Sequence, residues 1–321
     1  MTPAILIEGA RKQFRDTVAV RELDLRIETG SLCGFLGPNG AGKSTTIRMI
    51  MSIILADSGR IEVLGGSALD AKDRIGYLPE ERGLYRKMRV GEFLGYIGKL
   101  KGVPKRTSAA RAQQWLERLE LPNVFQKRCQ ELSKGMQQKV QFVAAVIHGP
   151  ELLILDEPFS GLDPVNARLM SGVVRDISET GATILFSTHQ MIHAEQLCDR
   201  VVLIDKGCKI LDATLDEIRA RFDPRSVQIE LMPGAVNGAA EAAEREFLGI
   251  PGVEGVEWMA ERRAARLRLE RGADGRSVMA AALASTPLRS VELSRVSLDD
   301  VFVELVGGGP PPSQEGGAGG D

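Results

Sequence analysis

The sequence has no apolar run long enough to cross a membrane. Its longest apolar stretches, such as residues 143–147 and 152–155, fall far short of the roughly 18 residues that a membrane span needs. Residues 1–8 show no charged segment followed by an apolar region, so we expect no secretory signal. We therefore predict a cytoplasmic protein, which can still bind a membrane protein without entering the bilayer itself.

Cysteine is scarce, and neither sign of charge is in excess. The four cysteines, Cys33, Cys129, Cys198 and Cys208, lie far apart without metal-ligand spacing, which predicts reduced thiols rather than a zinc site or disulfides. The 41 basic and 43 acidic side chains give a net charge of -2, so nothing in the charge indicates a nucleic-acid partner. A chain of 321 residues is long enough for two domains.

One glycine-rich stretch lies between an apolar run, residues 32–36, and a helical pattern, residues 44–54. It matches G-x-x-x-x-G-K-[ST] in full, and a strand, a glycine-rich turn and a helix in this order are what a phosphate-binding loop requires. A connector that binds nothing is the alternative. We predict that ATP is bound by Gly37, Pro38, Asn39, Gly40, Ala41, Gly42, Lys43, Ser44 and Thr45. Lys43 is expected to reach the β- and γ-phosphates, and the Ser44 hydroxyl to bind Mg²⁺.

Two adjacent carboxylates, Asp156 and Glu157, follow the apolar run at residues 152–155. A continuous apolar run indicates a strand buried on both faces of a parallel sheet. Ligands of such sheets bind beyond the carboxyl ends of the strands, which would bring both acids beside the phosphate loop. We predict that Asp156 shares Mg²⁺ with Ser44 and that Glu157 polarises the attacking water. The alternative is a pair of surface acids.

Four further residues are candidates on weaker local signals. His189 follows a predicted strand, residues 183–187, and is placed to donate to the γ-phosphate. Ser133 is a good N-cap for a helix that runs to about residue 148, and Gly135 lets a ligand approach its first turn. Phe14 precedes the phosphate loop, and we expect it to stack on adenine rather than to be a core aromatic.

Together these features resemble the ATP-binding subunit of ABC transporters over about residues 4–222. By position, Phe14 matches the aromatic loop, residues 37–45 the Walker A loop, residues 132–136 the signature motif, Asp156 the Walker B aspartate, Glu157 the catalytic glutamate, residues 160–163 the D-loop and His189 the switch histidine. The resemblance implies that Ser133 and Gly135 contact a γ-phosphate.

Two places depart from the commonest family pattern. Glu80 stands where a glutamine usually follows Tyr-x-Pro, and its carboxylate can accept from a water or contact Mg²⁺. The signature has Lys134 and Met136 where glycine and glutamine are commonest. Both departures, with residues 80–85, resemble the subgroup that includes sodium-extrusion and daunorubicin-resistance-type exporter ATPases, so they bear on rate and coupling more than on ATP binding.

The predicted fold is α/β. An ABC-type ATPase domain, residues 1–222, combines a mixed sheet core, an antiparallel β subdomain and a helical subdomain at about residues 80–148, in which we expect a short helix at 124–128. Residues 226–306 show the order βαββαβ, which matches a ferredoxin-like α+β domain and resembles the C-terminal domain of the same subgroup. Residues 307–321 are rich in Gly and Pro and predicted to be disordered.

The resemblance implies an ATPase that powers an exporter. Only one set of motifs is present, so it implies a head-to-tail homodimer with two ATP molecules sandwiched between phosphate loop and signature helix, peripheral on the inner face of the membrane through a separate multi-spanning permease. One alternative is a soluble ABC-type ATPase acting on ribosomes or DNA, although two ATPase halves, long coiled coils and zinc-binding cysteines are missing. Another is a nucleotide-gated module without turnover, against which Glu157 and His189 argue.

Overall fold

The computed structural model describes residues 2–81, 83–222, 226–232, 239–259, 263–270, 272–293 and 297–307. The tail predicted to be disordered lies, from residue 308 onward, outside this part of the chain. Two compact units are present, one formed mainly by Met1–Leu215 and the other by Asp216–Val301. Each has its own buried apolar core.

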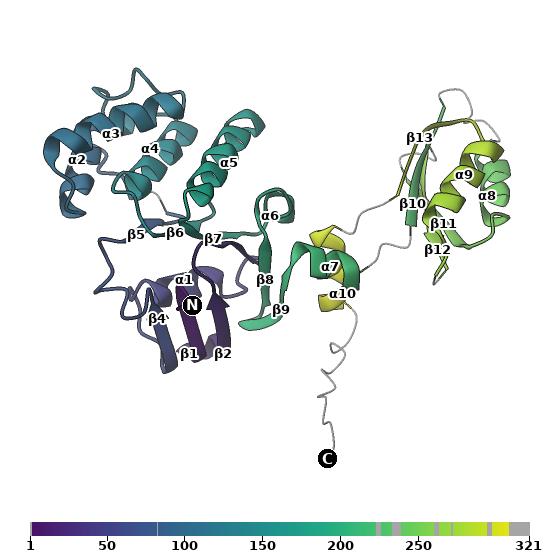
Figure 1. Ribbon diagram of the computed structural model, residues 1–321, viewed down its shortest axis with the longest axis horizontal. Helices are drawn as coiled ribbons and strands as arrows, with labels where there is room; N and C mark the ends of the chain where they lie inside the picture. The colour runs from purple at the N-terminus through teal and green to yellow at the C-terminus, as the bar shows by residue number, and fades with distance from the viewer. Residues whose placement is uncertain are drawn as a thin grey trace, which may run out of the picture. The chain divides into compact units, whose positions relative to one another are not determined.

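The first unit is built on a six-stranded sheet that is parallel except for its last strand (Figure 1). Short apolar strands in its centre are buried on both faces, as expected of a parallel sheet. In spatial order the strands are β5 (Ile75–Leu78), β6 (Leu152–Asp156), β7 (Thr183–Thr188), β3 (Leu32–Leu36), β8 (Arg200–Asp205) and β9 (Cys208–Thr214).

A second, antiparallel sheet and one helix complete the core of this unit. The sheet has the order β2 (Thr17–Ile27), β1 (Ile5–Phe14), β4 (Ser58–Val63), and its apolar side chains join one cluster with those of β3 and of α1 (Lys43–Ile50). Helix α1 therefore starts directly after the glycine-rich loop and is anchored from both sheets.

Helices α2 (Val90–Leu100), α3 (Lys105–Arg118) and α4 (Lys134–Val146) form the predicted helical subdomain, and α5 (Pro164–Glu179), α6 (Met191–Leu197) and α7 (Leu215–Arg221) follow. The short helix predicted at residues 124–128 is wrong, since the segment forms turns followed by the 3-10 helix η1 (Cys129–Glu131). The backbone N–H groups of Val90 and Gly91 donate to the carbonyls of Lys127 and Phe125. These carbonyls are thus paired with the start of α2 rather than within a local helix.

The second unit has the predicted ferredoxin-like topology. Its antiparallel sheet has the order β11-β12-β10-β13, and Val227, Ile229, Leu267 and Phe247 lie in its core. The elements are β10 (Ser226–Leu231), α8 (Ala239–Leu248), β11 (Val253–Met259), β12 (Ala264–Leu269), α9 (Gly275–Ser285) and β13 (Leu288–Leu293). Helix α10 (Leu298–Gly307) follows in the chain, and its residues from Phe302 onward group with the first unit. The predicted mixed α/β fold with an α+β C-terminal unit is confirmed.

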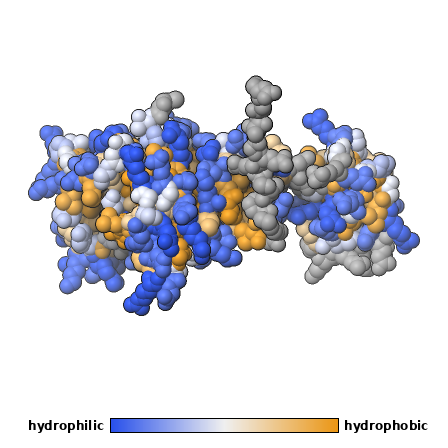
Figure 2. All heavy atoms as spheres, turned by 90° about the horizontal axis from the view of Figure 1, so that it is seen from below, coloured by the Kyte–Doolittle hydropathy of each residue, from blue (hydrophilic) through white to orange (hydrophobic). Residues whose placement is uncertain are grey.

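No helix within the described ranges is long and apolar enough to span a membrane. On the face seen in Figure 2, hydrophobic residues occur in separate groups among hydrophilic ones.

Candidate nucleotide site

The glycine-rich loop runs from the end of β3 into α1. At two of its positions, steric crowding explains why the residue is glycine. A Cβ on Gly37 would lie 2.2 Å from the Ile204 carbonyl oxygen, and one on Gly42 would lie 2.5 Å from that of Ala19. Both also have positive φ, 152° and 106°, which other residues rarely adopt. The loop therefore lies close against neighbouring backbone and leads directly into the N-terminus of α1, an arrangement that in general favours anions.

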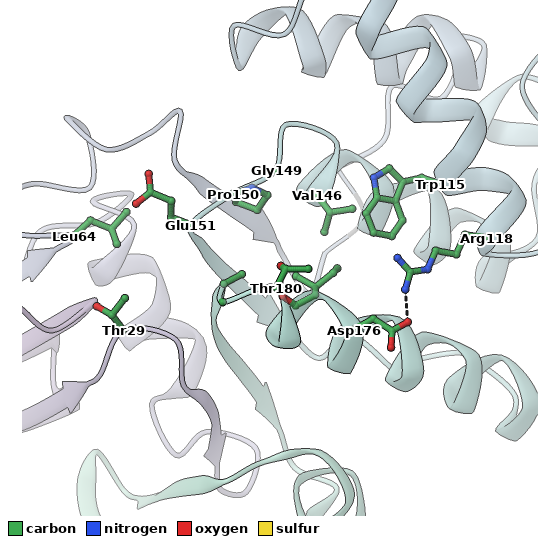
Figure 3. A pocket seen from close by; sticks show the side chains of 13 residues that line it. Thr29, Leu64, Trp115, Arg118, Val146, Gly149, Pro150, Glu151, Asp176 and Thr180 are labelled. Atoms are coloured by element: carbon green, nitrogen blue, oxygen red, sulfur yellow. Dashed lines mark hydrogen bonds and ion pairs between the residues drawn. The ribbon is translucent and has the colours of Figure 1, made fainter.

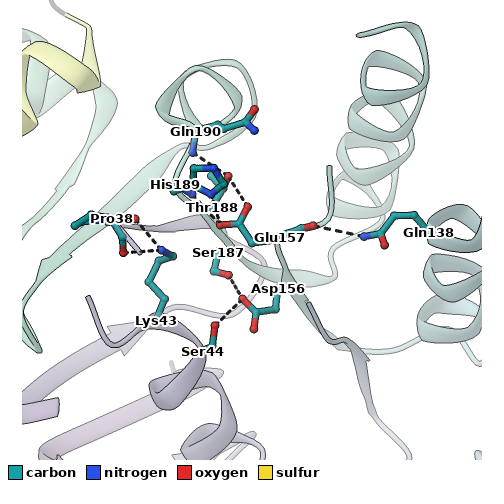
Figure 4. Close-up of polar contacts among 11 residues, drawn as sticks. Pro38, Lys43, Ser44, Gln138, Asp156, Glu157, Ser187, Thr188, His189 and Gln190 are labelled. Carbon is teal, nitrogen blue, oxygen red and sulfur yellow. Dashed lines mark hydrogen bonds and ion pairs between the residues drawn. The ribbon is translucent and has the colours of Figure 1, made fainter. Parts of the chain in front are cut away.

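Lys43 lies inside this loop. Its Nζ donates to the carbonyls of Gly37 at 2.7 Å and Pro38 at 3.1 Å, and the side chain is only 6% exposed (Figure 4). Burial lowers the pKa of Lys43, while the charges of Glu157, Asp156 and Glu80 act in the opposite direction. The ammonium group thus lies close enough to three carboxylates to interact with them electrostatically, and phosphate oxygens could also accept hydrogen bonds from it there.

Strand pairing brings the predicted acid Asp156 to the same edge. Within the sheet, Asp156 is opposite Ser187 of β7, and Thr188 of β7 is opposite Leu36 at the end of β3. The carboxylate Oδ1 accepts from the hydroxyls of Ser187 and, at 3.5 Å, of Ser44. Burial raises the pKa of Asp156, and these two hydrogen bonds oppose that rise. Ser44 and Asp156, distant in sequence, therefore offer neighbouring oxygen ligands.

Glu157 is the next residue, and the backbone turns sharply there, with a positive φ of 49°. Its Oε1 lies 2.7 Å from His189 Nδ1 and accepts from the His189 backbone N–H at 3.0 Å, and its Oε2 accepts from Thr188 Oγ1 at 3.2 Å. Such a backbone conformation costs about 1–3 kcal/mol and is concentrated at functional sites. The end of β7 thus holds the carboxylate of Glu157 in one direction, as Figure 4 shows.

The signature residues lie elsewhere in the same unit. Ser133 caps α4 and accepts from the Met136 N–H at 3.3 Å, and Ser133 and Lys134 are exposed. A cavity of about 480 Å³ opens beside them, and Gly135, Gly161 and Asp163 are among the residues that line it. All its described lining residues fall within 120–166, so the phosphate loop contributes none of them.

Comparison with known proteins agrees with this geometry. Residues 20–160 match the ABC transporter family, and residues 214–306 match the C-terminal domain of DrrA1-3-like ATP-binding proteins. The ABC transporter ATP-binding protein YhaQ of Bacillus subtilis is 39% identical over 305 residues, which cover 94% of this chain and 98% of YhaQ. The chain belongs to the ABC transporter ATP-binding proteins.

Two other likenesses refine that assignment. The daunorubicin resistance ATP-binding protein DrrA3 of Streptomyces coeruleorubidus is 34% identical, with 95% of this chain and 96% of DrrA3 covered. A solved structure of an ATP binding subunit of an ABC transporter is 30% identical, covers 69% of this chain and 94% of its own, and has a TM-score of 0.64. The predicted resemblance to exporter ATPases of the daunorubicin-resistance type is confirmed, and the chain is an ATPase of that family.

Two predicted site residues of this ABC ATPase stand apart from the buried group. Phe14 ends β1 at the turn into β2, is 47% exposed, and has Lys12 Nζ 5.4 Å from its ring centroid. Glu80 is exposed in the loop after β5, and its charge is near enough to oppose in part the lowering of the Lys43 pKa by burial. Both are accessible to a nucleotide, and neither is fixed by packing.

Sequence reasoning missed a link between α4 and the ABC ATPase site. Gln138 on α4, 2% exposed, donates its side-chain amide to the carbonyls of Pro158 at 3.1 Å and Glu157 at 3.4 Å (Figure 4). The signal available was a glutamine among the buried positions of a largely apolar helix. Helix α4, which starts after Ser133, is thus bonded to the loop that carries Glu157.

A separate cavity of about 430 Å³ lies at the other edge of the main sheet. Glu151 and Ala182, which line it, directly precede β6 and β7, and Arg118 of α3 forms an ion pair with Asp176 of α5 beside it (Figure 3). Because nucleotide loops follow the carboxyl ends of parallel strands, this cavity is distinct from the ATP site.

Proposed function

We propose that this ATPase drives an exporter as a head-to-tail homodimer attached to a separate membrane permease. The observation that carries the proposal is the separation of the two parts of the nucleotide machinery. Lys43, Asp156 and Glu157 converge at the sheet edge, whereas Ser133 and Gly135 face a cavity that the phosphate loop does not line. A second copy would supply its signature residues to the nucleotide of the first.

Magnesium is the metal that suits the ligands. Ser44 Oγ and Asp156 Oδ1 are hard oxygen donors 3.5 Å apart, and Mg²⁺ in nucleotide sites takes one or two protein oxygens plus phosphates and water. A bound Mg²⁺ would neutralise charge on the phosphates. It would also favour the ionised form of Asp156, whose pKa is raised by burial. We propose Ser44 and Asp156 as its ligands, with Glu80 as a third contact.

In the proposed mechanism Glu157 orients and polarises the attacking water. Its carboxylate accepts hydrogen bonds from the end of β7, which leaves lone pairs free for a water proton. The imidazole of His189, 43% exposed, is positioned to turn from Glu157 toward a γ-phosphate. Lys43 would donate to the β- and γ-phosphates, which would replace the carbonyls of Gly37 and Pro38 as its acceptors.

An aromatic group on the helical subdomain supports a permease contact. Tyr85 lies edge-on to Phe93 and Tyr96, with ring centroids 6.0 and 5.7 Å apart, and Tyr85 and Tyr96 are 52% and 40% exposed. Exposed aromatic rings are common at the centres of protein interfaces. The group adjoins the loop of Glu80, where we propose that the permease senses ATP. The resistance function in the name of DrrA3 favours export as the direction.

Co-purification tests this proposal directly. A tagged Glu157→Gln variant, isolated in ATP from mildly solubilised membranes of the source cell, should bring down a multi-spanning membrane protein at near-equal stoichiometry, with two copies of this chain per complex. A Lys43→Ala variant, which should not retain ATP, is the matched control and should yield monomer. Recovery only from the soluble fraction with ribosomal or DNA-associated partners would reject the transport role in favour of the soluble alternative.

A further inference from the structure

Glu80 lies in a loop whose backbone is bonded on both sides to one side chain. The amide nitrogen of Gln141, on α4, donates to the carbonyl of Glu81 at 3.2 Å and to that of Pro79 at 3.4 Å. These two residues flank Glu80 directly. The two hydrogen bonds therefore bracket the residue that replaces the usual glutamine of this loop.

The Gln141 side chain is buried, only 5% exposed, and its orientation is set by its surroundings. Both neighbours are carbonyl oxygens, so the NH₂ end of the amide must face them. Its Oε1 is buried, and no donor reaches it from the parts of the chain that the structure describes. An unpaired buried carbonyl group is unfavourable. An apolar side chain of the same size would avoid that cost, so packing alone does not account for a glutamine here.

The same helix is bonded to the loop of the catalytic glutamate one turn earlier. Gln138 donates to the carbonyls of Glu157 and Pro158, as described above. Residues three apart lie on one face of a helix. Helix α4, which begins after Ser133, thus bonds through Gln138 and Gln141 to the two loops that carry Glu157 and Glu80.

We propose that Gln141 is a positioning residue that holds the Glu80 carboxylate toward the Mg²⁺ of bound ATP. The proposal rests on the role given to Glu80 above. The influence of Glu80 on the pKa of Lys43 is consistent with a carboxylate that faces the phosphate site. Without Gln141, the loop at residues 79–81 would lose its two bonds to α4, and Glu80 would sample directions away from the metal.

The test measures how much Mg²⁺ strengthens ATP binding. For the full-length chain, the dissociation constant of a fluorescent ATP analogue is measured with Mg²⁺ and with EDTA, and the ratio is taken. Gln141→Met removes the donor at constant length, and we expect the ratio to shrink about tenfold, because residues that orient a metal ligand typically contribute 10–100-fold to affinity. If Gln141→Met does not fold, Gln141→Asn is measured in its place, because its shorter side chain keeps a polar amide but withdraws it from the two carbonyls.

A double-mutant cycle with Glu80→Gln separates positioning from general packing. If Gln141 acts through Glu80, Gln141→Met should not alter the ratio further in the Glu80→Gln background. Gln137→Met is the matched control, because Gln137 on the same helix donates to two carbonyls, those of Cys129 and Leu132, away from Glu80. Gln137→Met should either leave the ratio of the two dissociation constants unchanged or change it by the same factor with and without Glu80→Gln.

Two outcomes would overturn the inference, and they differ in what else they affect. If Glu80→Gln alone shrinks the ratio and Gln141→Met does not, the positioning role fails while the proposed metal contact of Glu80 stands. Glu80→Gln keeps a side-chain oxygen, so Glu80→Ala, which has none, is measured beside it. If neither variant changes the ratio, both the metal contact and the positioning role are wrong.

Discussion

The phosphate side and the signature side of the candidate nucleotide site differ in how firmly contacts within one chain hold their side chains in place. On the phosphate side, Lys43, Asp156 and Glu157 are 6%, 1% and 7% exposed. Lys43 is bonded to backbone carbonyls of its own loop, and the two acids are bonded to Ser187 and His189 at the end of β7. On the signature side, Ser133 is exposed, and the hydrogen bond it accepts comes from its own helix. The first part is preorganised within the chain, and the second offers its groups outward.

This difference indicates which property each part controls. Preorganised groups need only small side-chain changes to bind nucleotide and align the reaction, because most of the cost of ordering them is met during folding. Groups that face outward contribute only when another surface brings a nucleotide to them. Substitutions on the phosphate side should therefore act within one chain, and substitutions on the signature side only in an assembly.

The largest expected effect comes from Glu157→Gln. The amide keeps the shape of the side chain but cannot accept a proton from water, so hydrolysis should slow by about 10²–10⁴-fold while ATP binding is retained. Steady-state phosphate release and equilibrium nucleotide binding measure the two quantities.

A matched control is available at the opposite end of the same strand. Glu151, exposed and paired with Arg74, precedes β6, whereas Glu157 follows it. Glu151→Gln should leave hydrolysis within about twofold, as is usual for exposed ion pairs. A Glu157→Gln variant that hydrolyses ATP at the parental rate would remove Glu157 from the role of base.

A smaller effect, of a different kind, is expected from Ser133→Ala. A hydrogen bond to a charged phosphate typically contributes about 1.5–3 kcal/mol, so turnover should fall roughly 10–100-fold. ATP affinity of the isolated monomer should stay unchanged, because Ser133 faces away from its own phosphate loop in this proposal. Turnover as a function of protein concentration, compared with monomer affinity, measures both.

Loss of the helix cap is the competing explanation, and Ser133→Asp addresses it. Aspartate caps helices as well as serine does, yet its charge repels phosphate. Both variants should lose turnover, although only the alanine variant loses the cap. If Ser133→Asp hydrolyses ATP normally, the signature side does not contact a phosphate and the proposed dimer is wrong.

The sequence was most informative where structure is local. The strand, glycine-rich turn and helix around residues 32–50 were predictable because each element carries its own signal, and the run ending at Asp156 indicated a buried parallel strand. Once the strands were known to be parallel, the meeting of Ser44, Asp156 and His189 at one edge followed from topology.

The sequence was least informative where partners are distant along the chain. The helix predicted at residues 124–128 fails because two of its carbonyls accept from Val90 and Gly91, which no local pattern reveals. Gln138 and Gln141 likewise appear in the sequence only as polar residues on a buried helix face. Their acceptors are decided by how α4 packs against the loops after β5 and β6.

The smallest effect concerns an exposed residue that should nevertheless act within one chain. If Phe14 stacks on adenine, Phe14→Ala should weaken ATP binding by about 1 kcal/mol, roughly fivefold, with little change in turnover at saturating ATP. Phe14→Trp, which keeps an aromatic face, should restore affinity. Fluorescent-nucleotide titration of the monomer measures both variants. Equal affinity in all three proteins would mean that Phe14 is only the aromatic tip of the β1–β2 hairpin and does not contact adenine. The exposed candidate residues tested here would then act on nucleotide only when a second chain is present.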